Sequence, residues 1–160
     1  MRALLALLAS ISIAIAGIAD VAWAGSARPT TLELSVLLAT HGDAGTSIDP
    51  QLRELPQLTR DEPFVRYDVY RLIDRRAFAL ETGKPVSCAL VNGRTVRATL
   101  QGKSDDAGPR RYQIAVQIAE PGKKDYLRTL TVTASENQPF FVGGQAYRGG
   151  TLFLELVIRT

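Results

Sequence analysis

The sequence predicts an all-β fold, a small antiparallel β-sandwich or partly open barrel, with one short helix near the N-terminus of the folded part. Three observations lead to this prediction. Several short segments alternate apolar and polar side chains, as strands with one buried face do. Turn-forming pairs such as Asn92-Gly93 and Pro121-Gly122 separate these segments. Helical periodicity is scarce, so sheets are expected to form the core.

The first segment has the pattern of an export signal. Arg2 supplies a positive charge, residues 3–18 are almost entirely apolar, and Ala22-Trp23-Ala24 has the small-x-small form that a signal peptidase recognises. We therefore expect residues 1–24 to be a cleaved signal peptide and residues 25–160 to form a single β domain.

Retention of this segment as a membrane anchor is the competing interpretation, because about 18 or more apolar residues can span a bilayer. Ser10, Ser12 and Asp20 interrupt its apolar character, which favours cleavage. After cleavage we expect no membrane span and a periplasmic or extracellular location.

Charge and cysteine content argue against nucleic-acid binding and against an internal disulfide. The net charge of +3 is ordinary for a small domain and gives no case for nucleic-acid binding. The single cysteine, Cys88, has no partner for an internal disulfide, although a disulfide to another chain stays open.

The strand pattern begins at residues 31–38, where apolar residues recur at every second position. Residues 41–47 are rich in turn formers. Asp49 can cap a short helix that starts at Pro50 and ends before Pro56, covering residues 50–55.

Residues 63–80 fit two structures. Their apolar positions include a helical spacing, whereas their β-branched and aromatic residues favour strands. We favour strands, with a bulge or bend, because the residues from Val65 to Val69 alternate in one phase and those from Tyr70 to Leu80 in the other.

Two hairpins and a final strand complete the expected fold. Residues 86–91 and 95–100 flank Asn92-Gly93, and residues 112–118 and 126–132 flank Pro121-Gly122. In the last segment, residues 152–158, leucine and isoleucine recur on one face while Phe153 and Val157 lie on the other, so partial burial on both sides is expected.

The glycine pairs Gly143-Gly144 and Gly149-Gly150 are interpreted as tight turns between the final strands, because glycine adopts positive φ without strain. With Tyr147 and Arg148 between them, they could also meet an anion. They do not lead from a strand into a helix, so a nucleotide-binding loop is excluded.

Catalytic and metal motifs are weak throughout. His41 and Cys88 are the only histidine and cysteine, and Cys88 lies in a predicted strand where a lone thiol packs as an apolar group. The zinc-binding pairs and the serine-hydrolase motif Gly-x-Ser-x-Gly are both missing from the sequence. Asp105-Asp106 is only a fragment of a calcium loop. We expect no cofactor and no metal.

Arginine and tyrosine are the residue types that most often carry interface energy. The candidate binding residues are Arg66, Tyr67, Tyr70, Arg71, Tyr147 and Arg148. Acidic residues lie among them, so a self-neutralising surface is the simpler interpretation of part of this cluster.

The sequence favours a non-catalytic binding or scaffold module of the bacterial cell envelope, which meets a protein partner through a sheet edge or the Arg/Tyr-bearing surface. Its oligomeric state stays open. The alternative is a periplasmic hydrolase that cleaves envelope sugars through paired carboxylates, which need not be close in sequence. Acids available for that role are Glu54, Asp61, Glu62, Asp68, Asp74 and Glu81.

Overall fold

The fold is known from a computed structural model, which describes residues 29–160 except 44, 105–108, 124–125 and 127–128. The predicted signal peptide and its cleavage site lie outside the described residues, and so does the Asp105-Asp106 pair. Within the described part, no helix is long and apolar enough to cross a membrane.

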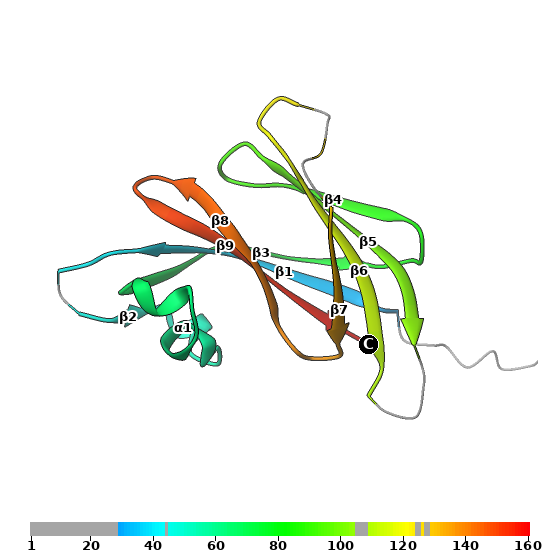
Figure 1. Ribbon diagram of the computed structural model, residues 1–160, viewed down its shortest axis with the longest axis horizontal. Coiled ribbons are helices and arrows are strands. Elements are labelled where there is room, and N and C mark those ends of the chain that lie inside the picture. The colour runs from blue at the N-terminus through cyan, green and yellow to red at the C-terminus, as the bar shows by residue number, and fades with distance from the viewer. Residues whose placement is uncertain (1–28, 44, 105–108, 124–125, 127–128) are drawn as a thin grey trace, which may run out of the picture.

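Strands make up most of the described chain (Figure 1). They are β1 (Thr31–Thr40), β2 (Ser47–Ile48), β3 (Val69–Ala79), β4 (Pro85–Ala89), β5 (Thr95–Ser104), β6 (Arg111–Ala119), β7 (Leu130–Ser135), β8 (Phe140–Tyr147) and β9 (Gly150–Arg159). Three short helices lie between β2 and β3: η1 (Pro50–Leu52), α1 (Gln57–Arg60) and η2 (Phe64–Arg66).

These strands form two separate sheets packed face to face, an arrangement like a sandwich. One sheet has five strands in the order β2-β3-β1-β9-β8, and the other has four in the order β4-β5-β6-β7. All pairs are antiparallel except β2 with β3. The expectation of a mostly β, antiparallel fold is therefore confirmed.

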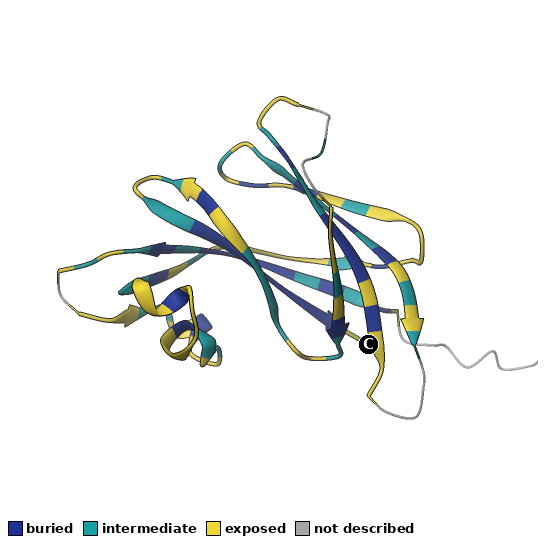
Figure 2. Cartoon of the chain, in the orientation of Figure 1, coloured by how far each residue is buried: buried dark blue, intermediate teal, exposed yellow. Residues whose placement is uncertain are grey.

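The main core lies between the sheets, and alternation along β1, β5, β6 and β9 supplies it (Figure 2). Leu152, Leu154, Leu156 and Ile158 on β9 are fully buried against residues of the four-stranded sheet. We call the side of the five-stranded sheet that faces this core its inner face, and the opposite side its outer face.

A second core covers part of the outer face. Leu52, Leu58 and Phe64 from the three short helices pack on Leu37 and Phe153 of the sheet, and all five are nearly inaccessible to solvent. Figure 1 places these helices beside one end of the sheet, near β2. The predicted burial of β9 on both sides is thus confirmed.

A bulge in β3 allows one strand to serve both cores. The pairing with β1 skips Ile73, so Leu72 lies opposite Leu37 while Asp74 lies opposite Val36. Tyr70 and Leu72 therefore face the second core, whereas Phe78 faces the first. Strand structure with a bulge was predicted for residues 63–80, but the bulge lies at Ile73, within the stretch from Tyr70 to Leu80 that was predicted to keep one phase, and not before Tyr70.

Two local expectations need correction. The start of that segment is helical, because η2 occupies Phe64–Arg66 before β3 begins. The pair Gly143-Gly144 is not a turn between strands: it lies inside β8, where the register with β9 shifts between Gly143 and Gln145. The predicted short helix is the 3₁₀ helix η1, which ends at Leu52, and the Asp49 side chain caps it by accepting from Gln51 N.

Candidate functional site

Strand β8 forms one edge of the five-stranded sheet. Among the described strands it pairs with β9 alone, so its other side presents backbone N–H and C=O groups without strand partners. A two-residue turn, Arg148-Gly149, joins β8 to β9, and both residues have positive φ, 43° and 75°. Glycine adopts positive φ without strain, whereas arginine does so rarely. Of the predicted turn pair Gly149-Gly150, only Gly149 lies in the turn, because Gly150 begins β9.

The hairpin fixes the direction of the backbone groups along the edge. Residues that flank a two-residue turn exchange hydrogen bonds, and here these residues are Tyr147 and Gly150. Alternation along the antiparallel strand then directs the N–H and C=O of Ala146 away from β9. The side chain of Ala146 is exposed, so nothing large shields these groups.

The bulge at Gly143-Gly144 changes the face on which β8 side chains lie. Val142, before the bulge, lies opposite Leu154 on the inner face, and Gln145, after it, lies opposite Leu152 on the same face. Phe141 lies opposite Glu155 on the outer face. The edge strand therefore offers different side chains to the two faces of the sheet.

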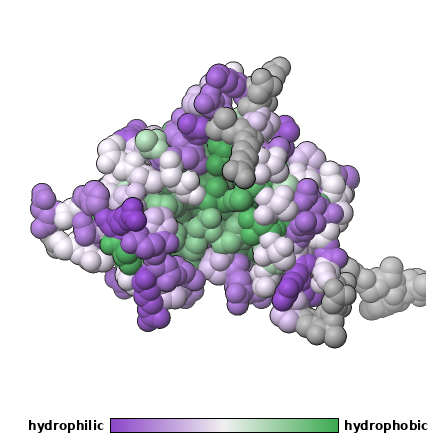
Figure 3. Space-filling model, viewed as in Figure 1, coloured by the Kyte–Doolittle hydropathy of each residue, from purple (hydrophilic) through white to green (hydrophobic). Residues whose placement is uncertain are grey.

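A groove of about 460 Å³ opens on the inner side of β8, between it and the four-stranded sheet. We call it the apolar groove; its lining is Arg94, Val116, Ile118, Leu130, Val142, Gly143, Gly144, Gln145 and Ala146. Figure 3 shows a hydrophobic surface at the centre of the same view. Leu130, at the start of the other edge strand β7, is 45% exposed there, which is high for a leucine in a sheet.

Gln145 gives the apolar groove a polar group. Its side chain is 8% exposed, and its Oε1 accepts a hydrogen bond of 2.9 Å from Asn92 Nδ2 in the β4–β5 turn. The Nε2 atom is buried and has no hydrogen-bond partner among the described residues. A buried amide donor left unpaired costs about 1–3 kcal/mol, which a bound acceptor would offset.

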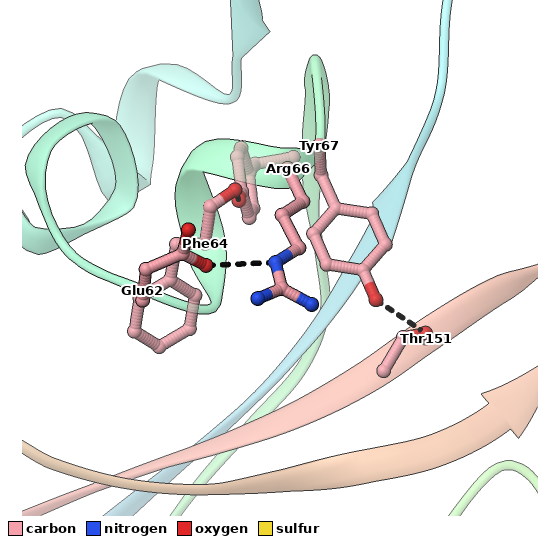
Figure 4. A network of polar contacts seen from close by, with 6 residues as sticks. Glu62, Phe64, Arg66, Tyr67 and Thr151 are labelled. Carbon is pink, nitrogen blue, oxygen red and sulfur yellow. Dashed lines mark hydrogen bonds and ion pairs between the residues drawn. The ribbon is translucent and has the colours of Figure 1, made fainter.

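A second groove, of about 490 Å³, opens on the outer side of β8. We call it the aromatic groove; its lining is Glu62, Pro63, Phe64, Tyr67, Phe141, Gly143, Gly144, Thr151 and Phe153. The Phe64 ring lies 4.8 Å, centroid to centroid, from both Phe141 and Phe153. Tyr67 donates a hydrogen bond of 2.9 Å to Thr151 Oγ1, which ties η2 to β9 (Figure 4).

The structure brings two of the six predicted binding residues to the aromatic groove. Tyr67 lines it and stacks on His41 at 5.3 Å between ring centroids. Arg66 stands at its rim, where its Nε bonds Glu62 Oε2 at 2.8 Å (Figure 4).

The other four predicted residues lie elsewhere. Tyr70 is 1% exposed and donates to the carbonyl oxygen of Phe64, so its side chain belongs to the second core. Burial, with smaller contributions from Tyr67 and Asp68, raises the pKa of Tyr70 to about 12. Arg71 is exposed on β3, and the guanidinium of Arg148 lies 5.2 Å from the ring of Tyr147 at the hairpin tip.

Sequence reasoning singled out Tyr147 and Arg148, beside two glycine pairs, but not the β8 residues that line the grooves. In the sequence, Phe141 and Val142 form an ordinary apolar segment before a glycine pair, and Gln145 is a single polar residue after it. The signal that could have found them is the glycine pair itself, because glycines within a strand pattern mark a bulge or a close approach of another group.

Two of the six acids offered for catalysis line depressions, and they line different ones, although Glu54 shares its depression with Glu33 and Glu155. Glu62 lines the aromatic groove, whereas Glu54 lines a different depression on the outer face beside Gln57. Within the described residues, no group of three or more His, Cys, Asp or Glu side chains is placed to hold a metal ion.

Comparison with known proteins gave no relative. No family model matches the chain, and it matches no curated protein and no solved structure.

Proposed function

We propose that this chain is an exported, non-catalytic binding module of the bacterial cell envelope. In this proposal a small β-sandwich takes an extended segment of a partner protein against the free edge of β8. One observation carries it: the same unpaired edge has an apolar groove on one side and an aromatic groove on the other.

An added strand would use both grooves at once. Its backbone would bond to outward groups such as those of Ala146, and these bonds supply affinity without regard to sequence. Successive side chains of a strand point to opposite faces. One set of partner side chains would therefore enter the apolar groove near Leu130, and the alternate set would reach the aromatic groove near Phe141.

The Gln145 amide supports a partner with a polar group at one position. Its free Nε2 donor, among the apolar side chains Val142 and Val116, fits an oxygen acceptor on an otherwise apolar segment. Such a donor rejects a purely apolar side chain, because that chain would leave it unpaired.

Hydrolysis of envelope sugars is the competing function. It requires two carboxylates that face one substrate, about 5 to 9 Å apart. Glu54 and Glu62 lie in different depressions. Glu54 shares its depression with Glu33 and Glu155, but Glu33 is paired with Arg159. The free edge of β8, with a groove on each side, is the observation that favours binding.

Photo-crosslinking tests the edge proposal. A photoreactive residue at Leu130 should give an adduct with a partner in cells that naturally express the protein, and one at Ile73, which is 37% exposed on β3, should give none. Ala146→Pro removes an outward N–H and should abolish the adduct, while the matched variant Ala146→Ser retains it.

Circular dichroism would verify that both variants fold. An adduct that persists in folded Ala146→Pro protein, or one that forms equally at Ile73, would contradict strand addition at β8. Mapping the adduct should identify an extended segment with apolar residues at alternate positions.

Export is tested separately. Mass spectrometry of the protein recovered from the periplasm or medium should show a chain that begins at Gly25. Recovery of a chain that still carries Met1 and residues 2–24 would contradict cleavage.

A further inference from the structure

A polar basin of about 320 Å³ lies on the outer face of the five-stranded sheet, apart from both grooves that flank the free edge. Strands β1, β3 and β9 form its floor, and the η1–α1 segment and the β7–β8 connection form its walls. The residues that line this basin are Glu33, Ser35, Gln51, Glu54, Leu55, Gln57, Arg75, Asn137, Pro139, Glu155, Val157 and Arg159.

Glu155 stands in the floor of the basin. It is 6% exposed, and its carboxylate has no hydrogen bond or ion pair with any described residue. Its cross-strand neighbour on β1 is Ser35. The Ser35 hydroxyl accepts a hydrogen bond of 3.1 Å from Arg75 Nε and makes none with Glu155. Little of the Glu155 side chain reaches water and no protein donor compensates its charge, so a cationic group bound in the basin would stabilise it.

A second unused acceptor belongs to a residue that lines the basin. Gln57 Oε1 is buried and has no hydrogen-bond partner among the described residues. Gln57 belongs to α1 and Glu155 to β9, so a wall and the floor of the basin each contribute one of these residues. Neither the Glu155 carboxylate nor Gln57 Oε1 has a hydrogen-bond donor among the described residues, so a ligand of the basin must supply donors.

The charges of the lining residues also favour a ligand with a positive charge. Three carboxylates line it (Glu33, Glu54 and Glu155) against two guanidinium groups (Arg75 and Arg159), which leaves one negative charge uncompensated. Arg159 is already engaged, because its Nε bonds Glu33 Oε2 at 3.1 Å and its Nη1 bonds Asn137 Oδ1 at 2.9 Å.

We infer that the basin binds a small organic cation that carries one protonated amine, held by the Glu155 carboxylate and the Gln57 side-chain oxygen. An ammonium group offers three donors, which matches the two unused acceptors and the single excess charge. The volume lies at the lower end of the range for small-molecule pockets, about 300 to 1,000 Å³, so the ligand is small.

Nuclear magnetic resonance can test this with simple probes. Butylamine should shift the amide signals of Ser35, Gln57 and Glu155 in a saturable way, whereas butanol, its neutral isostere, and butyrate, an anion of the same length, should not. Glu155→Gln keeps the shape of the side chain but removes the charge. It should weaken butylamine binding by about tenfold or more, as expected when a charge-assisted hydrogen bond is lost.

Glu81→Gln is the matched control, because Glu81 is an exposed carboxylate that is paired with Lys84 and lines neither the basin nor the two grooves. This variant should bind butylamine as the wild type does. If butylamine causes no saturable shift, or if Glu155→Gln and Glu81→Gln bind it alike, the inference fails.

Thermal unfolding supplies an independent measurement. Without a probe, Glu155→Gln should melt at a higher temperature than the wild type, because it removes an unpaired buried charge. Butylamine should raise the melting temperature of the wild type more than that of Glu155→Gln. Gln57→Leu, which removes the other acceptor from a helical wall, should also weaken butylamine binding. Unchanged binding in that variant would overturn the assigned role of Gln57.

Discussion

The ring of Phe153 occupies the space where a side chain at Gly143 would lie. A Cβ atom on Gly143 would approach Phe153 Cδ1 to 2.2 Å and Cε1 to 2.5 Å. The two residues face each other across β8 and β9 on the outer face, and Phe153 is only 3% exposed. A bare backbone at Gly143 therefore lets this ring lie flat between the second core and the aromatic groove.

Gly143→Ala should destabilise the protein by about 1–3 kcal/mol, because the Phe153 ring is packed on its other side and cannot move freely. Chemical denaturation measures the change in the free energy of unfolding. Gly102→Ala is the matched control: a Cβ there meets nothing within 4 Å, so the stability should be unchanged or slightly increased. Equal effects of the two substitutions would contradict the close packing of Phe153 on Gly143.

Tyr70→Phe should lower the free energy of unfolding by about 0.5–1.5 kcal/mol at neutral pH, because it removes the hydrogen bond from the Tyr70 hydroxyl to the carbonyl oxygen of Phe64, which then accepts only from Tyr67 N. The difference should depend on pH. The folded pKa of Tyr70, about 12, lies above its ordinary value of 10.0, so the fold favours the neutral phenol. This contribution is complete below about pH 10 and is lost as the pH rises toward 12.

Denaturation curves of the wild type and Tyr70→Phe at several pH values between neutrality and 12 provide the measurement. The gap between the two proteins should narrow above pH 10, because only the wild type loses the Tyr70 contribution. A gap that stays constant over the whole range would show that Tyr70 ionises equally well in the folded and unfolded states.

Local pattern was sufficient to predict most of the sheet structure. Alternation on β9 and the turn signal at Asn92-Gly93 depend on neighbours within a few residues, and the structure has them where the pattern indicates. The start of the segment 63–80 was predicted as strand but is a 3₁₀ helix, because Phe64 packs into the second core from that conformation. That contact involves Phe141 and Phe153, which are distant in sequence.

The candidate sites could not be predicted from the sequence because they too depend on contacts between residues that are distant in the chain. The basin brings Ser35, Arg75 and Glu155 together through the register of three strands, which no local pattern encodes. In the sequence, Glu155 reads as one polar position among apolar ones, and its burial follows only from the helices that cover the outer face. The arginine and tyrosine cluster was visible by composition, but composition could not separate the buried Tyr70 from the exposed Arg71.

Cys88 should be inert to thiol reagents in the folded protein. It is 4% exposed, and burial raises the pKa of its thiol, so little reactive thiolate forms at mildly alkaline pH. A colorimetric disulfide reagent should react slowly with the native protein and at once after denaturation. A dimer on a non-reducing gel, or fast labelling of the native state, would contradict this burial and support a disulfide between chains.

Leu58→Ala should destabilise the protein by about 2–5 kcal/mol, because this side chain on α1 is 1% exposed and its removal leaves a cavity in the second core. The same variant should expose the bond after Arg60 to trypsin, since the helical segment is held to the sheet by a few such contacts. Val65→Ala is the control in the same segment: Val65 is 46% exposed, and its loss should change stability by no more than about 0.5 kcal/mol. Equal trypsin resistance of Leu58→Ala and the wild type would mean that the segment is anchored without this leucine, and the second core would then have to depend on Phe64 instead.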